Sequence, residues 1–121
     1  MNYTILIVDD EPDVTLYLQK RLDSLGYNVI TASDGQEGLQ KAFQAKPELI
    51  LLDIMMPKKD GLATLKELRA AEATRNIPVI MLTARGESNS IFTFQELGAL
   101  DYIIKPFEFE ELLKYIKKYT L

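Results

Sequence analysis

The sequence predicts a doubly wound α/β domain in which helices cover both faces of a five-stranded parallel sheet. Short aliphatic runs alternate along the chain with stretches of helical periodicity, the order that βαβ units produce. Three of these runs are almost entirely apolar, as expected for strands that are covered on both faces. The length of 121 residues fits a single domain, residues 1–121, with one sizeable core.

The expected strands are residues 3–8, 28–32, 49–52, 79–82 and 102–104. The second is the most mixed in polarity, so we place it at an edge of the sheet. Right-handed crossovers leave few topologies for five βα units. We choose the strand order 2-1-3-4-5, known from other doubly wound proteins, which opens a crevice between the carboxyl ends of strands one and three.

The first two helices show ordinary start and stop signals. The first begins near Pro12, ends near Gly26 and is expected to turn four residues inward: Val14, Leu18, Leu22 and Leu25. The second covers about residues 36–45 and is expected to face the sheet with Leu39, Ala42 and Phe43.

Three more helices complete the pattern. The third follows Gly61 and is broken by residues 76–78, and the fourth lies within residues 88–97. The fifth follows Pro106 and carries three lysines on its outer side, which we interpret as a solvated face: Lys114, Lys117 and Lys118.

The composition excludes several functional classes. Without histidine the chain has no Ser-His-Asp triad and no His-ligated zinc site, so any metal must be held by oxygen. A net charge of −4 without a basic stripe argues against direct contact with nucleic acid. No apolar stretch approaches the roughly 20 residues of a bilayer span. With no cysteine and no secretory signal, we expect a cytoplasmic protein that does not contact a membrane.

Acidic residues fall where the predicted crevice opens. Asp9 and Asp10 follow strand one, and Asp53 follows strand three. Crowded carboxylates raise one another's pKa values unless a cation lies among them, and their hard oxygens suit Mg²⁺. The alternative for Asp9 and Asp10 is that they only cap the following helix, which would leave Asp53 unexplained.

Two further strand ends supply polar groups. A carboxylate such as Asp53 can attack a phosphoryl group to form an aspartyl phosphate, provided that the negative charges are screened. Lys105 supplies an ammonium after strand five, and Thr83 supplies a hydroxyl after strand four. Each has an ordinary explanation as a strand-end residue. The Lys105-Pro106 bond is a candidate for the cis form.

The set of motifs resembles the receiver domain of two-component response regulators. These motifs are the acid pair Asp9-Asp10, Asp53 within LLDIMMP, Thr83 within TA, and Lys105 within KPF. The resemblance covers essentially the whole chain and implies a flavodoxin-like fold. It also implies that Asp53 accepts a phosphoryl group from a histidine kinase or a phosphotransfer protein.

The resemblance assigns further roles. Mg²⁺, or Mn²⁺ in its place, would be held by Asp10, Asp53 and the backbone carbonyl of Met55, with Asp9 bound directly or through water. Thr83 and Lys105 would hold the phosphoryl oxygens. Tyr102 would be the switch residue that turns inward as Thr83 moves toward the phosphate.

Output in the resembling family comes from helix four, strand five and helix five. A downstream protein, a fused output domain or a second copy in a homodimer would bind there. The chain departs from the family at Phe94, Leu97 and Leu100, where smaller or more polar residues are usual. One hypothesis is that Phe92 or Phe94 is partly exposed and contributes to a partner surface, and the alternative is that both pack inward.

Met55 and Arg85 lie two residues past Asp53 and Thr83. In the resembling family these positions flank the path of the water that hydrolyses the acyl phosphate. We predict that Met55 and Arg85 set the lifetime of the phosphate, because bulk or charge there screens that water.

Two other functions stay open. One is a true aspartyl-phosphate hydrolase or phosphotransferase, although enzymes of the haloacid dehalogenase class typically carry a second aspartate where this chain has Met55. The other is an interaction scaffold, receiver-like or flavodoxin-like, that works without phosphate. The complete set of phosphorylation residues counts against that scaffold. The chain is therefore expected to catalyse only its own phosphorylation and dephosphorylation.

Overall fold

The structure, a computed structural model, describes residues 3–54, 56, 59–84 and 98–120. Five parallel strands form one sheet in the order β2-β1-β3-β4-β5, which confirms the predicted topology. The strands are β1 (Thr4–Val8), β2 (Asn28–Ala32), β3 (Leu49–Asp53), β4 (Val79–Ala84) and β5 (Asp101–Lys105). β2 lies at an edge, as its mixed polarity predicted.

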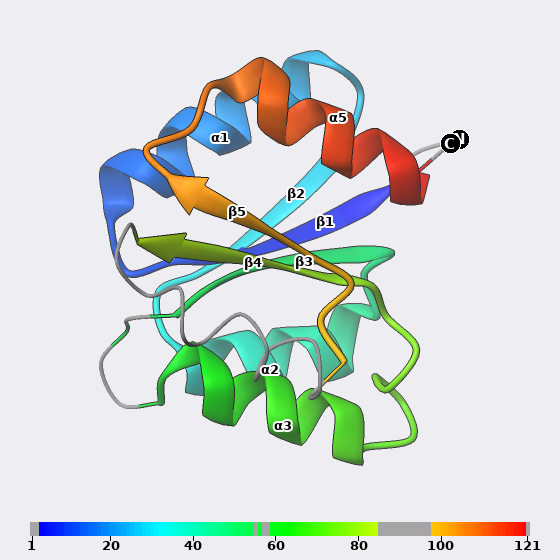
Figure 1. The fold of residues 1–121 in the computed structure, drawn as a ribbon. Helices are drawn as coiled ribbons and strands as arrows, with labels where there is room; N and C mark the ends of the chain where they lie inside the picture. Colours follow the sequence, from blue (N-terminus) through cyan, green and yellow to red (C-terminus); the bar gives the residue numbers. More distant parts are fainter. Residues whose placement is uncertain (1–2, 55, 57–58, 85–97, 121) are drawn as a thin grey trace.

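Helices cover both faces of the sheet (Figure 1). In the described part of the chain, α1 (Pro12–Ser24) and α5 (Phe109–Thr120) lie on one face, and α2 (Gly35–Ala45) and α3 (Gly61–Ala70) lie on the other. None of the helices in the described residues is long and apolar enough to cross a bilayer.

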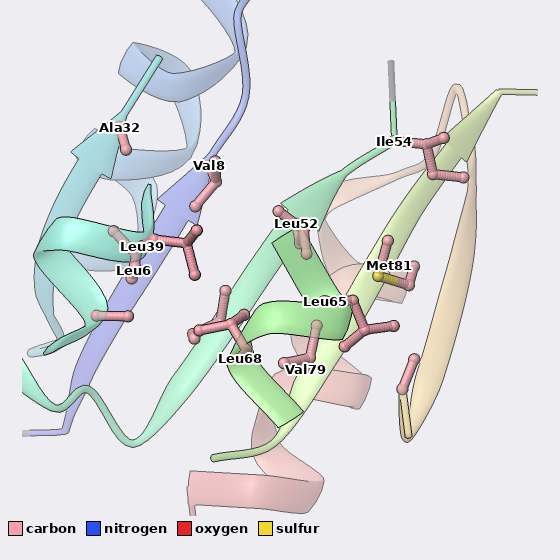
Figure 2. Close-up of a cluster of buried hydrophobic side chains, with 13 residues drawn as sticks. Leu6, Val8, Ala32, Leu39, Leu52, Ile54, Leu65, Leu68, Val79 and Met81 are labelled. Carbon is pink, nitrogen blue, oxygen red and sulfur yellow. The ribbon is translucent and has the colours of Figure 1, made fainter. Parts of the chain in front are cut away.

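Alternation along the strands divides the core into two layers. Leu6 and Val8 of β1 face α2 and α3, whereas Ile5 and Ile7 face α1 and α5. Figure 2 shows the first layer, where side chains of β1, β3 and β4 meet those of α2 and α3. Because both layers are apolar and buried, the inner strands are covered on both faces, and their carboxyl ends lie together at one edge of the sheet.

Local signals in the sequence explain where the helices begin. The carboxylates of Asp34 and Asp60 accept the N–H groups of Glu37 and Ala63, at 2.8 Å and 2.9 Å, and so cap α2 and α3. Pro12 occupies the first position of α1, where its missing N–H costs nothing. These residues set the points at which helices begin after the carboxyl ends of the strands.

Two residues expected in the core are exposed. Leu25 is 53% exposed because it follows the last turn of α1 as its C-cap and has left the helical face. Phe43 is 43% exposed. The helix α2 packs through its small residues, so close to β1 that a Cβ at Gly38 would lie 2.9 Å from Val8, and this centres the buried stripe away from Phe43.

Several boundaries differ from the expected ones. α3 ends at Ala70, well before residues 76–78, because Ala71 is extended and the buried hydroxyl of Thr74 donates to the carbonyl of Leu68 at 2.7 Å. β3, β4 and β5 extend past their apolar runs to include the polar residues at their carboxyl ends. The predicted fourth helix, with Phe92, Phe94 and Leu97, lies outside the described residues, while Leu100 is 55% exposed.

Candidate functional site

The carboxyl ends of four strands bring the predicted site residues to one edge of the sheet. Asp53 is the last residue of β3, and Asp9 follows β1 directly. Thr83 is the last residue but one of β4, and Lys105 is the last residue of β5. Asp9, Asp53 and Thr83 are buried, at 1%, 6% and 2% exposure, which is uncommon for polar side chains.

Four acids converge at this edge. One carboxylate oxygen each from Asp9, Asp10, Glu11 and Asp53 lies within 4.8 Å of the others. The sheet therefore brings together the acids of β1 and β3 as the strand order required. Glu11 was not expected in the group; the only signal for it in the sequence is its position beside the acid pair.

Lys105 reaches into the acid cluster. Its Nζ lies 2.9 Å from Oδ2 of Asp9, 3.4 Å from Oδ1 of Asp53 and 3.5 Å from Oε1 of Glu11. Burial alone lowers the pKa of this ammonium, but the hydrogen bond to Asp9 and the surrounding carboxylates outweigh it and raise the pKa. Lys105 is therefore a fixed positive charge beside Asp53. The peptide bond that follows, to Pro106, is cis.

The surroundings of Asp53 disfavour its ionised form. Burial, together with the negative charge of Asp9, raises its pKa from 3.8 to about 6, against the opposing attraction of Lys105 and the N–H of Ile54. The Ile54 N–H donates to Oδ1 at 2.9 Å. Burial and the charge of Asp9 therefore outweigh the attraction of Lys105 for the ionised carboxylate.

The chemistry of the donor set fits a hard divalent cation. The clustered groups are all carboxylates, Asp53 is buried beside the negative charge of Asp9, and Asp10 is open to solvent. Mg²⁺ prefers such oxygen ligands and keeps several waters. Met55, whose backbone carbonyl was the other predicted ligand, lies outside the described residues.

The alternative that Asp9 and Asp10 only cap a helix does not hold. Glu11 is the N-cap residue of α1, and its side chain makes no capping hydrogen bond. Asp9 instead accepts the N–H of Glu11 at 2.9 Å, while its own N–H donates to the carbonyl of Ala32 at 3.0 Å. Asp9 is thus fixed on both sides in the position from which it binds Lys105.

Gly61 supports the backbone of Asp53, a role that composition alone did not indicate. A Cβ at Gly61 would lie 2.3 Å from the carbonyl oxygen of Asp53 and 2.8 Å from Cα of Ile54. The Gly61 N–H also donates to the carbonyl of Ile54 at 2.8 Å. The start of α3 therefore packs directly against the end of β3, at a distance that only glycine permits.

The remaining predicted residues are placed as follows. Thr83 pairs with Ile104 in the sheet, next to the pair of Ala84 with Lys105. Tyr102 is half-buried and packs against the core layer shared with α2 and α3. Arg85 lies outside the described residues.

Two grooves flank the acid cluster. One, of about 230 Å³, is lined by Asp9 and Asp10 and by residues at the ends of β2 and α2, including Lys41. The other, of about 550 Å³, lies between α1 and the residues after β5 and is lined by Glu11, Lys105 and the apolar Tyr17 and Phe107 among others. The cluster is thus reachable from solvent on two sides.

Comparison with known proteins identifies this arrangement. The family model for the response regulator receiver domain matches residues 5–117. The chain is 47% identical over 117 residues to the alkaline phosphatase synthesis transcriptional regulatory protein PhoP of Bacillus subtilis, covering 97% of this chain and 48% of that protein. It is 42% identical over 113 residues to the DNA-binding dual master transcriptional regulator RpaA of Synechocystis, covering 93% of this chain and 47% of that protein. The chain thus spans about half the length of these curated relatives.

Solved structures agree with the family match. The chemotaxis protein CheY4 of Vibrio cholerae superposes with a TM-score of 0.92 at 31% identity, covering 98% of this chain and 99% of that one. A receiver domain of a Pseudomonas aeruginosa sensor histidine kinase, solved with a magnesium ion coordinated in its active site cleft, superposes with a TM-score of 0.89 at 32% identity and covers 98% of both chains. By sequence and by fold, this chain belongs to the family of response regulator receiver domains.

Proposed function

We propose that this receiver domain, residues 1–121, is a switch in which Asp53 accepts a phosphoryl group from a histidine kinase or a phosphotransfer protein. The observation that carries the proposal is the contact of Lys105 with Asp53 within a cluster of four acids at one sheet edge. A nucleophilic carboxylate, a fixed ammonium and hard oxygen ligands are the groups that phosphoryl transfer requires.

Each side chain has a defined part in the transfer. A carboxylate oxygen of Asp53 forms the new bond to phosphorus as the bond between phosphorus and the donor breaks. Lys105, whose raised pKa keeps it charged, pairs with a phosphoryl oxygen, and Thr83 donates its hydroxyl to another. Asp9 holds Lys105 in place at 2.9 Å before the donor arrives.

Mg²⁺ is the cation that we assign to this site, with Mn²⁺ as a substitute. Asp10, Asp53 and the backbone carbonyl of Met55 would hold it, with Asp9 bound directly or through water. When bound, the cation supplies positive charge that screens the phosphoryl oxygens from the carboxylates. A relative of known structure holds magnesium in its active site cleft, which supports the assignment.

The new dianion biases a two-state element. Thr83 of β4 pairs with Ile104 of β5. Ile104 lies two residues beyond Tyr102 on β5. A movement of Thr83 toward the phosphate leaves space into which the half-buried Tyr102 ring turns. The face that includes β5 and α5 then presents a changed surface to a downstream protein, a fused output domain or a second copy.

The output is a proposal because the chain spans about half of its regulator relatives. Those relatives are named as transcriptional regulators, which favours an output domain that acts on DNA. The net charge of −4 argues that any such contact is made outside this chain. Within the chain, the chemistry is limited to its own phosphorylation and dephosphorylation.

The decisive experiment is incubation with Mg²⁺ and acetyl phosphate, followed by intact mass. The chain should gain one phosphoryl group, and Asp53→Ala should gain none. Asp23→Ala, which removes an exposed carboxylate near the far end of α1, is the matched control and should still be phosphorylated. Phosphate gain that persists in Asp53→Ala would refute the assignment. Flavin absorbance in the purified protein would favour the scaffold alternative.

A further inference from the structure

The ammonium of Lys105 is shared among three carboxylates that differ in mobility. Asp9 and Asp53 are buried and held by backbone N–H groups, at 2.9 Å from Glu11 and from Ile54 respectively. The third partner, Glu11, has a side chain that is 61% exposed and lies 3.5 Å from the ammonium. Only the Glu11 carboxylate is free to leave Lys105 without disturbing the core.

We propose that Glu11 is a positioning residue that sets the rate at which anionic phosphodonors reach Asp53, by competing with the incoming phosphoryl group for Lys105. The inference rests on the proposed function and adds a residue to it. Before transfer, Glu11 occupies one side of the ammonium. A phosphoryl group that pairs with Lys105 must displace the Glu11 carboxylate or tolerate its charge nearby.

The location of Glu11 gives it this effect on approaching anions. Glu11 and Lys105 both line the groove between α1 and the residues after β5. An anion that approaches Lys105 through this groove therefore passes the Glu11 carboxylate. The Glu11 carboxylate repels an anion that comes next to Lys105, and this repulsion is substantial at a partly buried site. Salt screens the repulsion where the charges are exposed.

Asp9 cannot play the same part. Its carboxylate is buried, lies closer to Lys105 and is anchored by the N–H of Glu11. Removing its charge would disturb the acid cluster itself. Glu11 is the residue directly before α1, and its backbone is extended. Because its side chain makes no capping bond, its carboxylate can move while its backbone stays in place.

The test compares Glu11→Gln with Asp13→Asn. Asp13 lines the same groove and lies in the first turn of the same helix, but Lys105 makes its ion pairs with Asp9, Glu11 and Asp53 instead. Both variants remove one negative charge. The rate of phosphorylation by acetyl phosphate is followed by intact mass at saturating Mg²⁺, at about 0.1 M and about 1 M ionic strength.

We expect Glu11→Gln to be phosphorylated roughly 3- to 10-fold faster than the wild type at low salt, and the gain to fall below about twofold at high salt. The phosphorylation rate of Asp13→Asn should stay within about twofold of the wild-type rate at both ionic strengths. If Glu11 had only a structural role, the effect of Glu11→Gln on the rate would not depend on salt.

Three results would overturn the inference. Glu11→Gln could be phosphorylated on Asp53 at the same rate as the wild type at both ionic strengths. It could instead be slower and need more Mg²⁺, which would make Glu11 a ligand and not a competitor. If the wild type itself gains no phosphoryl group, the proposed function fails and the inference falls with it, and this outcome is distinguishable from the first two.

Discussion

Gly61 and Asp53 are in backbone contact so close that the start of α3 and the end of β3 act as one unit. A methyl group at Gly61 would lie 2.3 Å from the carbonyl oxygen of Asp53, nearer than atoms can approach. The contact is backbone to backbone, so no flexible side chain can move aside. The position of the Asp53 carboxylate therefore depends on a residue that carries no functional group.

Gly61→Ala should displace the end of β3 and impair phosphorylation. Overpacking of this kind costs about 1–3 kcal/mol of stability, and the displaced Asp53 carboxylate would no longer align with Lys105. We expect at least about a tenfold lower rate of phosphorylation, measured by intact mass beside urea denaturation.

The matched control for Gly61 is Gly26→Ala. Gly26 has φ +94° and open space where a Cβ would lie, far along the chain from the acid cluster. The substitution should cost a similar amount, about 1–2 kcal/mol, through backbone strain alone, with no change in phosphorylation. If both variants lost activity equally, general destabilisation would explain the effect.

Asp53→Asn should stabilise the metal-free fold near neutral pH. The folded-state pKa of about 6 exceeds the ordinary value of 3.8, so the folded protein holds this proton more tightly than the unfolded chain. That stabilisation is fully present below the ordinary pKa and is lost as pH rises through about 6. The variant avoids this loss.

The measurement is urea denaturation in the presence of a chelator. At about pH 7.5 Asp53→Asn should be more stable than the wild type, by about 1–3 kcal/mol. Near pH 4 the two proteins should converge, because Asp53 is then protonated in the folded state. Equal stability of the two proteins from about pH 4 to about pH 7.5 would show that the fold does not disfavour the ionised Asp53 carboxylate.

Mg²⁺ should stabilise the wild type through the same cluster. A cation that binds only the folded state adds about 2.7 kcal/mol at a concentration of 100 times its Kd. Asp10→Asn removes one exposed carboxylate of the cluster and should weaken this stabilisation. Asp23→Asn, an exposed acid near the far end of α1, should leave it unchanged. Melting temperature as a function of Mg²⁺ concentration distinguishes them.

Arg69 should be a major source of stability away from the site. It donates to the carbonyl of Gly98 through Nε at 3.0 Å and Nη2 at 2.8 Å, and to the carbonyl of Ile77 through Nη1 at 2.8 Å. It thereby ties the ends of α3 and of the following loop to the entrance of β5. Arg69→Ala should cost roughly 1.5–3 kcal/mol.

Lysine cannot replace this fork, because one ammonium cannot reach both carbonyls in the same plane. Arg69→Lys should therefore recover little of the loss. Arg75→Ala removes an exposed guanidinium close by and should change stability by less than about 0.5 kcal/mol. Denaturation midpoints for the three variants test whether the hydrogen bonds, and not the charge, provide the stability.

Met55 and Arg85 are predicted to set the lifetime of the aspartyl phosphate. Replacing both with alanine removes the bulk and charge that screen the attacking water, so the phosphate should be lost several-fold faster. Decay of the phosphorylated mass after removal of the donor measures the rate. An unchanged rate in the double variant would refute the assignment.

With the strand order taken from other doubly wound proteins, the sequence alone determined the edge position of β2 and the convergence of Asp9, Asp10 and Asp53. These follow from the polarity of short runs and from the rule that parallel strands end at one edge. The same reasoning placed Lys105 and Thr83 beside the acids, because both follow apolar runs of the same sheet. A pattern of this kind records which element carries a residue and at which end.

Only the tertiary structure decided how close the elements approach and which partners the side chains choose. Phe43 is exposed because the small residues of α2 let that helix pack close to β1, and Gly61 is required because α3 packs against the backbone of Asp53. Glu11 joins Lys105 because the first turn of α1 lies beside the end of β5. Such distances arise from the packing of whole helices, and no local pattern in the sequence encodes them.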